Sequence, residues 1–463
     1  MVVVLALLGS SAAILQWNLG ERWFGIVRAD PQANPGAVAP PSGLVFPAAV
    51  AAPALGVPLP TGDADPDAVR RALAARLREP HLGGHVVALV GSLAGGGPVF
   101  TSGTGRVAPA SSLKLLTATA ALEALGPATT FDTSVVRGAT SRDVVLVGGG
   151  DPFLASKPDR TGDAYPPRAD LTTLAQRTAS ALKTAGVTSV HLSYDDDLFT
   201  GPSLSPHWPD DYVTGSVITP ISALWVDHGF EADGFHRAKD PARQAADVFA
   251  TALARAGIKP SGTPTRTRAP VGATRIATVQ SATLDQVVQE VLQVSDNEGA
   301  EVLMRQLGLA VEGEGSFAAG VRAVRSTLQG LGTDVAGLQL YDGSGLSRDD
   351  RLSPRTLFDV LTLAAGTDHP ELRAVIEGLP VAAFSGSLED RFAEGSAAGR
   401  GWVRAKTGTL TGISALAGLA EDADGVLLAF VIVADRVDPL DTDEARAALD
   451  RAASALAACR CSA

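Results

Sequence analysis

Lysine is so sparsely used in this chain that each lysine calls for a chemical explanation. A buried lysine can lose its proton at accessible pH, whereas an arginine essentially cannot. Lys114 follows Ser111 by three residues at the start of an expected helix, so both side chains share one helix face. A serine hydroxyl is a weak nucleophile that needs a base beside it, and this spacing supplies one. The six lysines are Lys114, Lys157, Lys183, Lys239, Lys259 and Lys406.

A second lysine begins the sequence Lys406-Thr407-Gly408-Thr409 on an expected strand. Glycine weakens a strand and suits a place where another backbone approaches closely, such as a peptide substrate laid alongside. Lys406 would attract a carboxylate, and Thr407 and Thr409 offer hydroxyls. The N–H of Thr409 could complete an oxyanion hole with that of Ser111. The alternative is an ordinary hairpin strand with an exposed lysine.

The third candidate element is Ser295-Asp296-Asn297, which lies between the other two in the chain. Asparagine is rarer than lysine, and Asn297 is the only one after residue 34. Ser295 could relay a proton to a leaving group, and the Asn297 amide could hold Lys114 and a substrate carbonyl together. The alternative is a cap between a helix and a turn.

Five apolar runs predict the sheet that would position these residues. Two lie near the start of the chain, at 86–93 and 98–102, and three near its end, at 402–410, 413–420 and 426–434. Turn residues separate neighbouring runs, which favours antiparallel pairing. Both ends of the chain are therefore expected in one domain.

Helical periodicity adds the elements around that sheet. Helices are expected over 63–78 and 441–458, against the sheet, and over 111–125, where the first turn carries Ser111. The predicted fold class is α/β, of the α+β kind: a five-stranded antiparallel sheet flanked by helices, plus an inserted α+β domain.

The insertion is predicted over 129–275, and the catalytic domain over 63–128 and 276–463. A helical pattern resumes at 284–294. Within the insertion we expect strands at 144–147 and 189–193 and helices at 171–185 and 241–256.

Composition excludes several classes of protein. Hydrophobic residues make up 46% and charged residues 19%, so wholesale disorder is excluded. The net charge is −12 with no basic stripe, which argues against nucleic acid as a partner. The only cysteines, Cys459 and Cys461, cannot build a zinc site, and a local bridge, a bridge between chains and free thiols all stay open.

The histidines do not predict a metal centre. The zinc-protease pattern H-E-x-x-H is absent. The pairs His81/His85 and His228/His236 are expected to be exposed or hydrogen-bonded rather than to bind a metal. Neither a metal nor a cofactor is predicted.

The N-terminal 62 residues are predicted to form a leader segment that precedes the folded domains. Residues 1–20 carry no charge and are mostly apolar, which predicts a signal peptide or a membrane anchor, although no basic residue precedes the apolar run. A buried strand or helix is the alternative. Residues 21–62 are rich in Ala and Pro and are expected to be a linker. Export to the cell envelope and an N-terminal association with the membrane follow as expectations.

Together the three elements occur in the order S-x-x-K, S-x-N, K-T-G, a combination found in penicillin-binding proteins and β-lactamases. From about residue 85 to 458 the chain resembles the class C low-molecular-mass penicillin-binding proteins, which are D-Ala-D-Ala carboxypeptidases and endopeptidases with an inserted domain. Other stretches that resemble this family are 109–114, 147–152, 196–202, 342–348, 379–382 and 386–388.

The resemblance implies a role for each element. Ser111 would be the acylated nucleophile and Lys114 its base. Ser295 and Asn297 would line a second wall, beside a substrate strand of Lys406, Thr407, Gly408 and Thr409. Ser344, Gly345 and Leu346 would approach the site, and Trp208 and Tyr212 are candidates for contact with the substrate side chain. The implied partners are peptidoglycan stem peptides as substrate and β-lactam antibiotics as acylating inhibitors.

Two other functions share these features. A β-lactamase of class A carries a deacylating Glu in an E-x-x-x-N loop, but Gln293 stands four residues before Asn297. A silent envelope protein that binds peptidoglycan or a partner would have no reason to keep both Lys114 and Lys406. Turnover of a D-Ala-D-Ala peptide distinguishes an enzyme from a binding protein.

Overall fold

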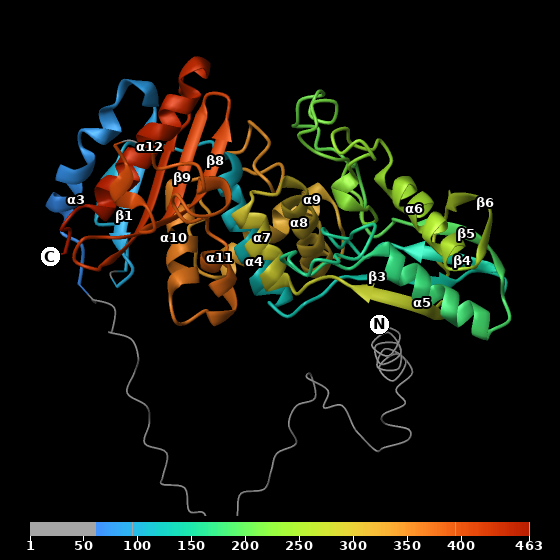
Figure 1. Cartoon of the computed structure of the whole chain (residues 1–463). Helices are drawn as coiled ribbons and strands as arrows, with labels where there is room; N and C mark the ends of the chain where they lie inside the picture. The colour runs from blue at the N-terminus through green and yellow to red at the C-terminus, as the bar shows by residue number, and fades with distance from the viewer. Residues whose placement is uncertain (1–61, 95, 394, 463) are drawn as a thin grey trace, which may run out of the picture. The chain divides into compact units, whose positions relative to one another are not determined.

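The first sheet joins strands from near the start and the end of the described chain, as the apolar runs predict (Figure 1). The computed structural model describes residues 62–94, 96–393 and 395–462. The sheet has the strand order β2-β1-β10-β9-β8, and each neighbouring pair is antiparallel. Its strands are β1 (Val86–Ser92), β2 (Phe100–Ser102), β8 (Val403–Leu410), β9 (Ile413–Glu421) and β10 (Leu427–Ala434).

Helices cover both faces of this sheet because its central strands are buried throughout. On one face, α3 (Pro66–Leu73) and α12 (Thr442–Ala457) share an apolar core with strand residues such as Phe430. On the other face lies α10 (Pro354–Ala365), whose Phe358 joins the main core. The predicted helix over 63–78 is shorter, because Asp65 caps α3 and only a 3-10 turn follows it.

A cluster of helices next to α10 carries most of the remaining main core. Its centre is α4 (Lys114–Leu125), whose residues are buried from Lys114 to Leu122. The 3-10 turn η3 (Ala110–Leu113) leads directly into α4, so the predicted helix over 111–125 consists of two parts. The other helices of the cluster are α7 (Leu284–Gln293), α8 (Asn297–Glu312), α9 (Phe317–Gly330) and α11 (Arg373–Glu377).

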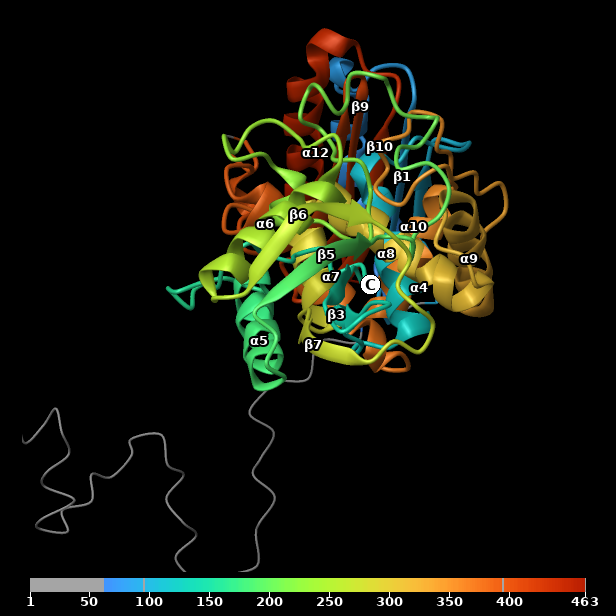
Figure 2. The same ribbon diagram turned by 90° about the vertical axis from the view of Figure 1, so that its right-hand side faces the viewer.

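The second sheet is built from the middle of the chain and lies across the helix cluster from the first sheet (Figures 1 and 2). Its order is β6-β5-β4-β3-β7, with β4, β5 and β6 parallel. Parallel neighbours need a crossover, which α5 (Leu171–Thr184) and α6 (Pro241–Arg255) provide. The strands are β3 (Asp132–Arg137), β4 (Asp143–Val147), β5 (Ser189–Asp195), β6 (Lys259–Arg266) and β7 (Arg275–Gln280). Because β7 belongs to it, this sheet runs five residues beyond position 275.

Short 3-10 turns complete the regular elements. They are η1 (Arg76–Arg78), η2 (Pro80–Leu82), η4 (Asp227–Gly229), η5 (Pro370–Leu372), η6 (Gly386–Leu388), η7 (Ala397–Gly399) and η8 (Pro439–Asp441).

Two features of the chain ends remain. Cys459 and Cys461 are paired with each other, which decides between the alternatives left open by the sequence. The predicted signal peptide or anchor at 1–20 and nearly all of the linker at 21–62 lie outside the described residues. Among the helices of the described ranges, none has the length and apolar character needed to span a membrane.

Candidate active site

The amine of Lys114 is the point where the predicted elements meet. Its Nζ donates to Ser111 Oγ at 2.9 Å, to Asn297 Oδ1 at 2.8 Å and to the backbone oxygen of Ser344 at 2.9 Å. An ammonium has three N–H donors, so all three are used. The structure thus brings Ser111, Lys114, Asn297 and Ser344 together, from segments up to 230 residues apart.

Burial changes the acid–base chemistry of this amine. The side chain of Lys114 is fully buried, and desolvation lowers its pKa from 10.5 to about 8. The negative charges of Glu301, Asp296 and Asp342 act in the opposite direction and keep the pKa from falling further. An amine with a pKa near neutrality can accept the Ser111 proton, which is what a general base must do.

The backbone before Ser111 adopts an uncommon conformation. Ala110 has a φ of +46°, in the left-handed region that residues with a Cβ rarely enter. The turn η3 then places Ser111 half-buried and Ser112 fully buried, with the Ser112 hydroxyl donating to the Pro109 carbonyl at 2.6 Å. The bend therefore presents Ser111, rather than its neighbour, to the site.

Lys406 forms a second buried amine on β8. Its Nζ donates to Ser295 Oγ at 2.8 Å and to the Thr407 carbonyl at 2.9 Å. Complete burial, together with the positive charges of Lys114 and Arg391, lowers the pKa of Lys406 well below its usual value. Ser295, between α7 and α8, has a φ of +61°, so strained backbone occurs on this wall too.

Gly408 is required because the backbone of the turn that carries Ser111 approaches it closely, in addition to the substrate that was expected there. A Cβ added here would stand 2.5 Å from the Pro109 carbonyl oxygen and 3.1 Å from the Ser112 nitrogen. The backbone that approaches closely is therefore the turn carrying Ser111, and not only a substrate laid alongside. Thr407 is also fixed, since its hydroxyl shares a 2.8 Å hydrogen bond with the hydroxyl of Ser387.

The outer edge of β8 is partly open. β8 ends the sheet order, and its first half pairs outward with residues 380–382, where the Ala405 N–H donates to the Pro380 carbonyl. Backbone groups alternate in direction along a strand, so the N–H groups of Thr407 and Thr409 also point away from β9. Thr409 is exposed, and this edge can accept a peptide as a further strand.

The loop from Asp342 to Leu346 forms the back of the site. Ser344 contributes its backbone oxygen to Lys114, and its own side chain is fully buried. Gly345 has a φ of +81°, and a Cβ there would stand 2.0 Å from the Ala110 carbonyl. The loop therefore packs directly against the backbone that precedes Ser111.

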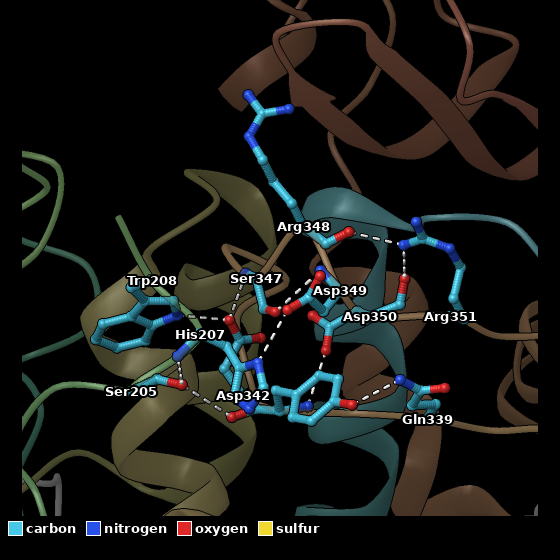
Figure 3. Close-up of polar contacts among 11 residues, drawn as sticks. Ser205, His207, Trp208, Gln339, Asp342, Ser347, Arg348, Asp349, Asp350 and Arg351 are labelled. Carbon is cyan, nitrogen blue, oxygen red and sulfur yellow. Dashed lines mark hydrogen bonds and ion pairs between the residues drawn. The ribbon is translucent and has the colours of Figure 1, made fainter. Parts of the chain in front are cut away.

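Asp342 holds this loop in place (Figure 3). Its carboxylate accepts the Gly345 N–H at 2.8 Å, the Ser347 N–H at 2.6 Å and the indole N–H of Trp208 at 2.7 Å. The neighbouring Asp350 is buried, and burial together with the charge of Asp342 raises its pKa well above the usual value. The hydrogen bonds to the Asp342 carboxylate therefore anchor the loop.

A cavity of about 440 Å³ lies beside the open edge of β8. Tyr212 lines it, whereas Trp208 is only 7% exposed and packs edge-to-face on Phe317. The two aromatic candidates thus differ: Tyr212 can meet a substrate, and Trp208 supports the loop from behind. Leu346, Arg348, Thr409 and Leu410 also line the cavity.

One group next to Asn297 has the geometry of a metal site. His228, Asp296 and Glu298 place one ligand atom each within 4.8 Å of one another. Arg237 lies 3.0 Å from Glu298, and the His228 ring lies 3.4 Å from Asp296. Arginine therefore already supplies a positive charge to this cluster, which disfavours a cation.

Two buried acids of the site are absent from the sequence prediction. Glu301 is 0% exposed, and Asp342 is equally buried. Glu301 stands four residues after Asn297 on α8, so the spacing alone places both on one helix face. Composition offers no such signal, because acidic residues are common in this chain and are usually exposed.

The comparison with protein families decides what the chain is. The model for the D-Ala-D-Ala carboxypeptidase 3 (S13) family matches residues 69–238 and 232–456. This chain belongs to that family. The resemblance drawn from the three sequence elements is confirmed.

Relatives and solved structures agree with the S13 assignment. A carboxypeptidase of Mycobacterium tuberculosis is 37% identical over 360 residues, 76% of each chain. The carboxypeptidase DacB of Mycolicibacterium smegmatis is 34% identical over 85% of this chain and 84% of its own. The structure of penicillin-binding protein 4 from Haemophilus influenzae has a TM-score of 0.68 at 20% identity, covering 83% of this chain and 97% of the other. That likeness confirms the predicted fold.

Proposed function

We propose that this S13 family member is a serine D-Ala-D-Ala carboxypeptidase whose nucleophile is Ser111 and whose base is Lys114. The observation that carries the proposal is the single buried amine bonded to Ser111 Oγ, Asn297 Oδ1 and the Ser344 oxygen. The carboxypeptidase relatives support the reaction class. The substrate is the stem peptide of peptidoglycan, cut before its terminal D-Ala, or at a cross-linked D-amino acid in an endopeptidase reaction.

Acylation begins with a proton transfer. Neutral Lys114 takes the Ser111 proton while Ser111 Oγ forms a bond to the carbonyl carbon of the penultimate D-Ala. The N–H groups of Ser111 and Thr409 face the oxygen on which negative charge develops. The two hydrogens of the neutral amine are held by Asn297 Oδ1 and the Ser344 oxygen, which leaves its lone pair directed at the Ser111 hydroxyl.

Release of the first product involves Ser295 and Lys406, on the second wall of the site. The C–N bond of the substrate breaks, and the leaving nitrogen needs a proton. Lys114 gives up the proton that it took from Ser111, and Ser295, hydrogen-bonded to Lys406 at 2.8 Å, passes a proton on to the nitrogen, so Lys114 is neutral again. The Lys406 charge attracts the terminal carboxylate of the peptide, which lies along β8. Water then attacks the ester carbonyl and gives a proton to neutral Lys114, the bond to Ser111 Oγ breaks, and Lys114 returns the proton to Ser111, which frees the shortened peptide and restores the hydroxyl.

Parts of the chain outside the site enter the proposal as well. We place the catalytic domain at 63–128 and 276–463 and the insertion at 129–275. We place the protein in the cell envelope, where its substrate lies, with residues 1–20 acting as an export signal or a membrane anchor.

The proposed substrate-binding residues are Thr407, Gly408, Thr409, Ser344, Gly345 and Leu346.

The experiment that tests this function is peptide turnover. A synthetic peptide that ends in D-Ala-D-Ala is incubated with the protein, and free D-alanine is measured. Release by the unaltered chain, with none by Ser111→Ala, is expected. Binding of the peptide without release, by a folded protein, would instead support the silent binding protein.

A further inference from the structure

Glu301 lies behind the catalytic amine, and among the described residues it is the one carboxylate that is hydrogen-bonded to the N–H groups of Gly343 and Ser344. It is 0% exposed on α8, one turn after Asn297. Its Oε1 accepts the N–H of Ser344 at 2.8 Å and that of Gly343 at 3.1 Å, and its Oε2 accepts the Gly343 N–H at 3.0 Å. A buried carboxylate that binds backbone in this way fixes the backbone position.

The backbone that Glu301 fixes is the one that reaches Lys114. The oxygen of Ser344 accepts Lys114 Nζ at 2.9 Å, and the oxygen of Gly343 accepts the hydroxyl of Thr117, one helical turn beyond Lys114. Two residues of α4 and one of α8 therefore clamp the same dipeptide. We propose that Glu301 is a positioning residue of the acylation step, holding the Gly343–Ser344 backbone so that the Ser344 oxygen orients the Lys114 amine.

The charges around the pair support this assignment. Glu301, Asp296, Asp342 and Glu298 all face Lys114, and Glu301 is the strongest of the acids that oppose the lowering of the Lys114 pKa by burial. Lys406 is the other amine of the site. Glu301 itself faces Asp342, Asp350 and the cation of Arg305.

Burial and the neighbouring charge of Asp342 raise the pKa of Glu301 to about 8, while the Ser344 side chain and the N–H groups of Gly343 and Ser344 favour its ionised form. The carboxylate thus has two separable effects, hydrogen bonding to the loop and negative charge near the amine.

Two substitutions separate these effects. Glu301→Gln keeps an oxygen that can accept both N–H groups but removes the charge. Glu301→Ala removes both. The matched control is Asp422→Asn, because Asp422, in the turn between β9 and β10, is likewise a buried acid that accepts backbone N–H groups, those of Asp424, Val426 and Cys461.

The measurement is the second-order rate of acylation by benzylpenicillin from pH 5.5 to 9.5, together with the melting temperature of each variant. Glu301→Gln should move the rising limb of the profile to lower pH, by about one unit, with a high-pH plateau within roughly threefold of the unaltered chain. Glu301→Ala should lower that plateau roughly tenfold or more. Asp422→Asn should change the melting temperature and leave both limb and plateau in place.

This inference rests on the proposed function, and its failure can be told apart from the failure of that function. Suppose that the unaltered chain is acylated. If the rising limb of the rate profile then stays in place in Glu301→Gln, or the high-pH plateau of the rate is unchanged in Glu301→Ala, the role of Glu301 alone is overturned. Absence of acylation in the unaltered, folded chain would overturn both. If Glu301→Ala does not fold, Glu301→Asp replaces it, because the shorter side chain keeps the charge but draws the carboxylate back from the Gly343 and Ser344 N–H groups; a plateau equal to that of the unaltered chain would then overturn the role of Glu301.

Discussion

Gly408 on β8 and Pro109 before the nucleophile lie so close that a Cβ on Gly408 would stand 2.5 Å from the Pro109 carbonyl oxygen. The strand that is proposed to bind substrate and the turn that carries Ser111 therefore fix each other. Their separation is set by the absence of one methyl group.

Gly408→Ala should push these two backbones apart. Because the contact atom is backbone and cannot rotate away, we expect acylation by benzylpenicillin to slow roughly 100-fold and stability to fall by about 1–3 kcal/mol. Acylation kinetics and thermal melting measure the two effects. The control is Gly330→Ala at the end of α9, where nothing lies within 4 Å of the added methyl. Normal acylation by a folded Gly408→Ala protein would contradict the contact.

The pH dependence of acylation follows from the Lys114 pKa of about 8. The base is the neutral amine, which predominates above this pKa, so the rate should rise through pH 7–9 and level off beyond it. Since burial lowers the pKa from 10.5, an exposed lysine would place the same rise above pH 10. The measurement is the acylation rate at constant ionic strength. A rate independent of pH between 6 and 9 would contradict lysine as the base.

Lys406→Met tests the second amine. Methionine has a similar volume and avoids the desolvation cost of a buried charge, so we expect a change in stability within about 2 kcal/mol. Acylation should fall roughly 100-fold, because Ser295 loses its donor and the substrate carboxylate loses its cation. Lys259→Met, at an exposed position on β6, is the control. Losses of stability and acylation in equal proportion would assign Lys406 to folding instead.

Trp208→Phe tests the support of the Asp342 loop. The change removes the indole N–H bonded to the carboxylate at 2.7 Å while an aromatic ring remains beside Phe317. Loss of a hydrogen bond to a charged group should cost about 1.5–3 kcal/mol, visible as a lower melting temperature. Acylation should slow several-fold as the loop loosens. Trp402→Phe, at an exposed tryptophan, should do neither.

Most of the sheet could be predicted from the sequence because its signals are local. Apolar runs bounded by turns mark β1, β8, β9 and β10, and their boundaries differ from the prediction by one or two residues. The three candidate elements of the site could be predicted from rare residue types at fixed spacing. Lys114 and Lys406 stand out because so few lysines compete with them.

The acids behind Lys114 depend on tertiary burial, which local pattern does not report. Glu301 and Asp342 are of residue types that usually lie on the surface, and only their buried hydrogen bonds, Glu301 to the 343–344 backbone and Asp342 to the N–H groups of Gly345 and Ser347, give them a role. The reason for Gly408 was likewise incomplete. A close backbone was expected, but its identity as the Pro109 turn required knowledge of two segments 300 residues apart. Trp208 was expected at the substrate and lies behind the loop.

The central claim is that Ser111 is the nucleophile of a slowly deacylating enzyme, and the intact mass of the protein after incubation with benzylpenicillin tests it most directly. A protein starting near residue 63 and its Ser111→Ala variant are compared, both shown to be folded by thermal melting. We predict a stable one-to-one adduct on the first and none on the second. An adduct that persists in Ser111→Ala, or rapid hydrolysis of the drug with no lasting adduct, would contradict the account.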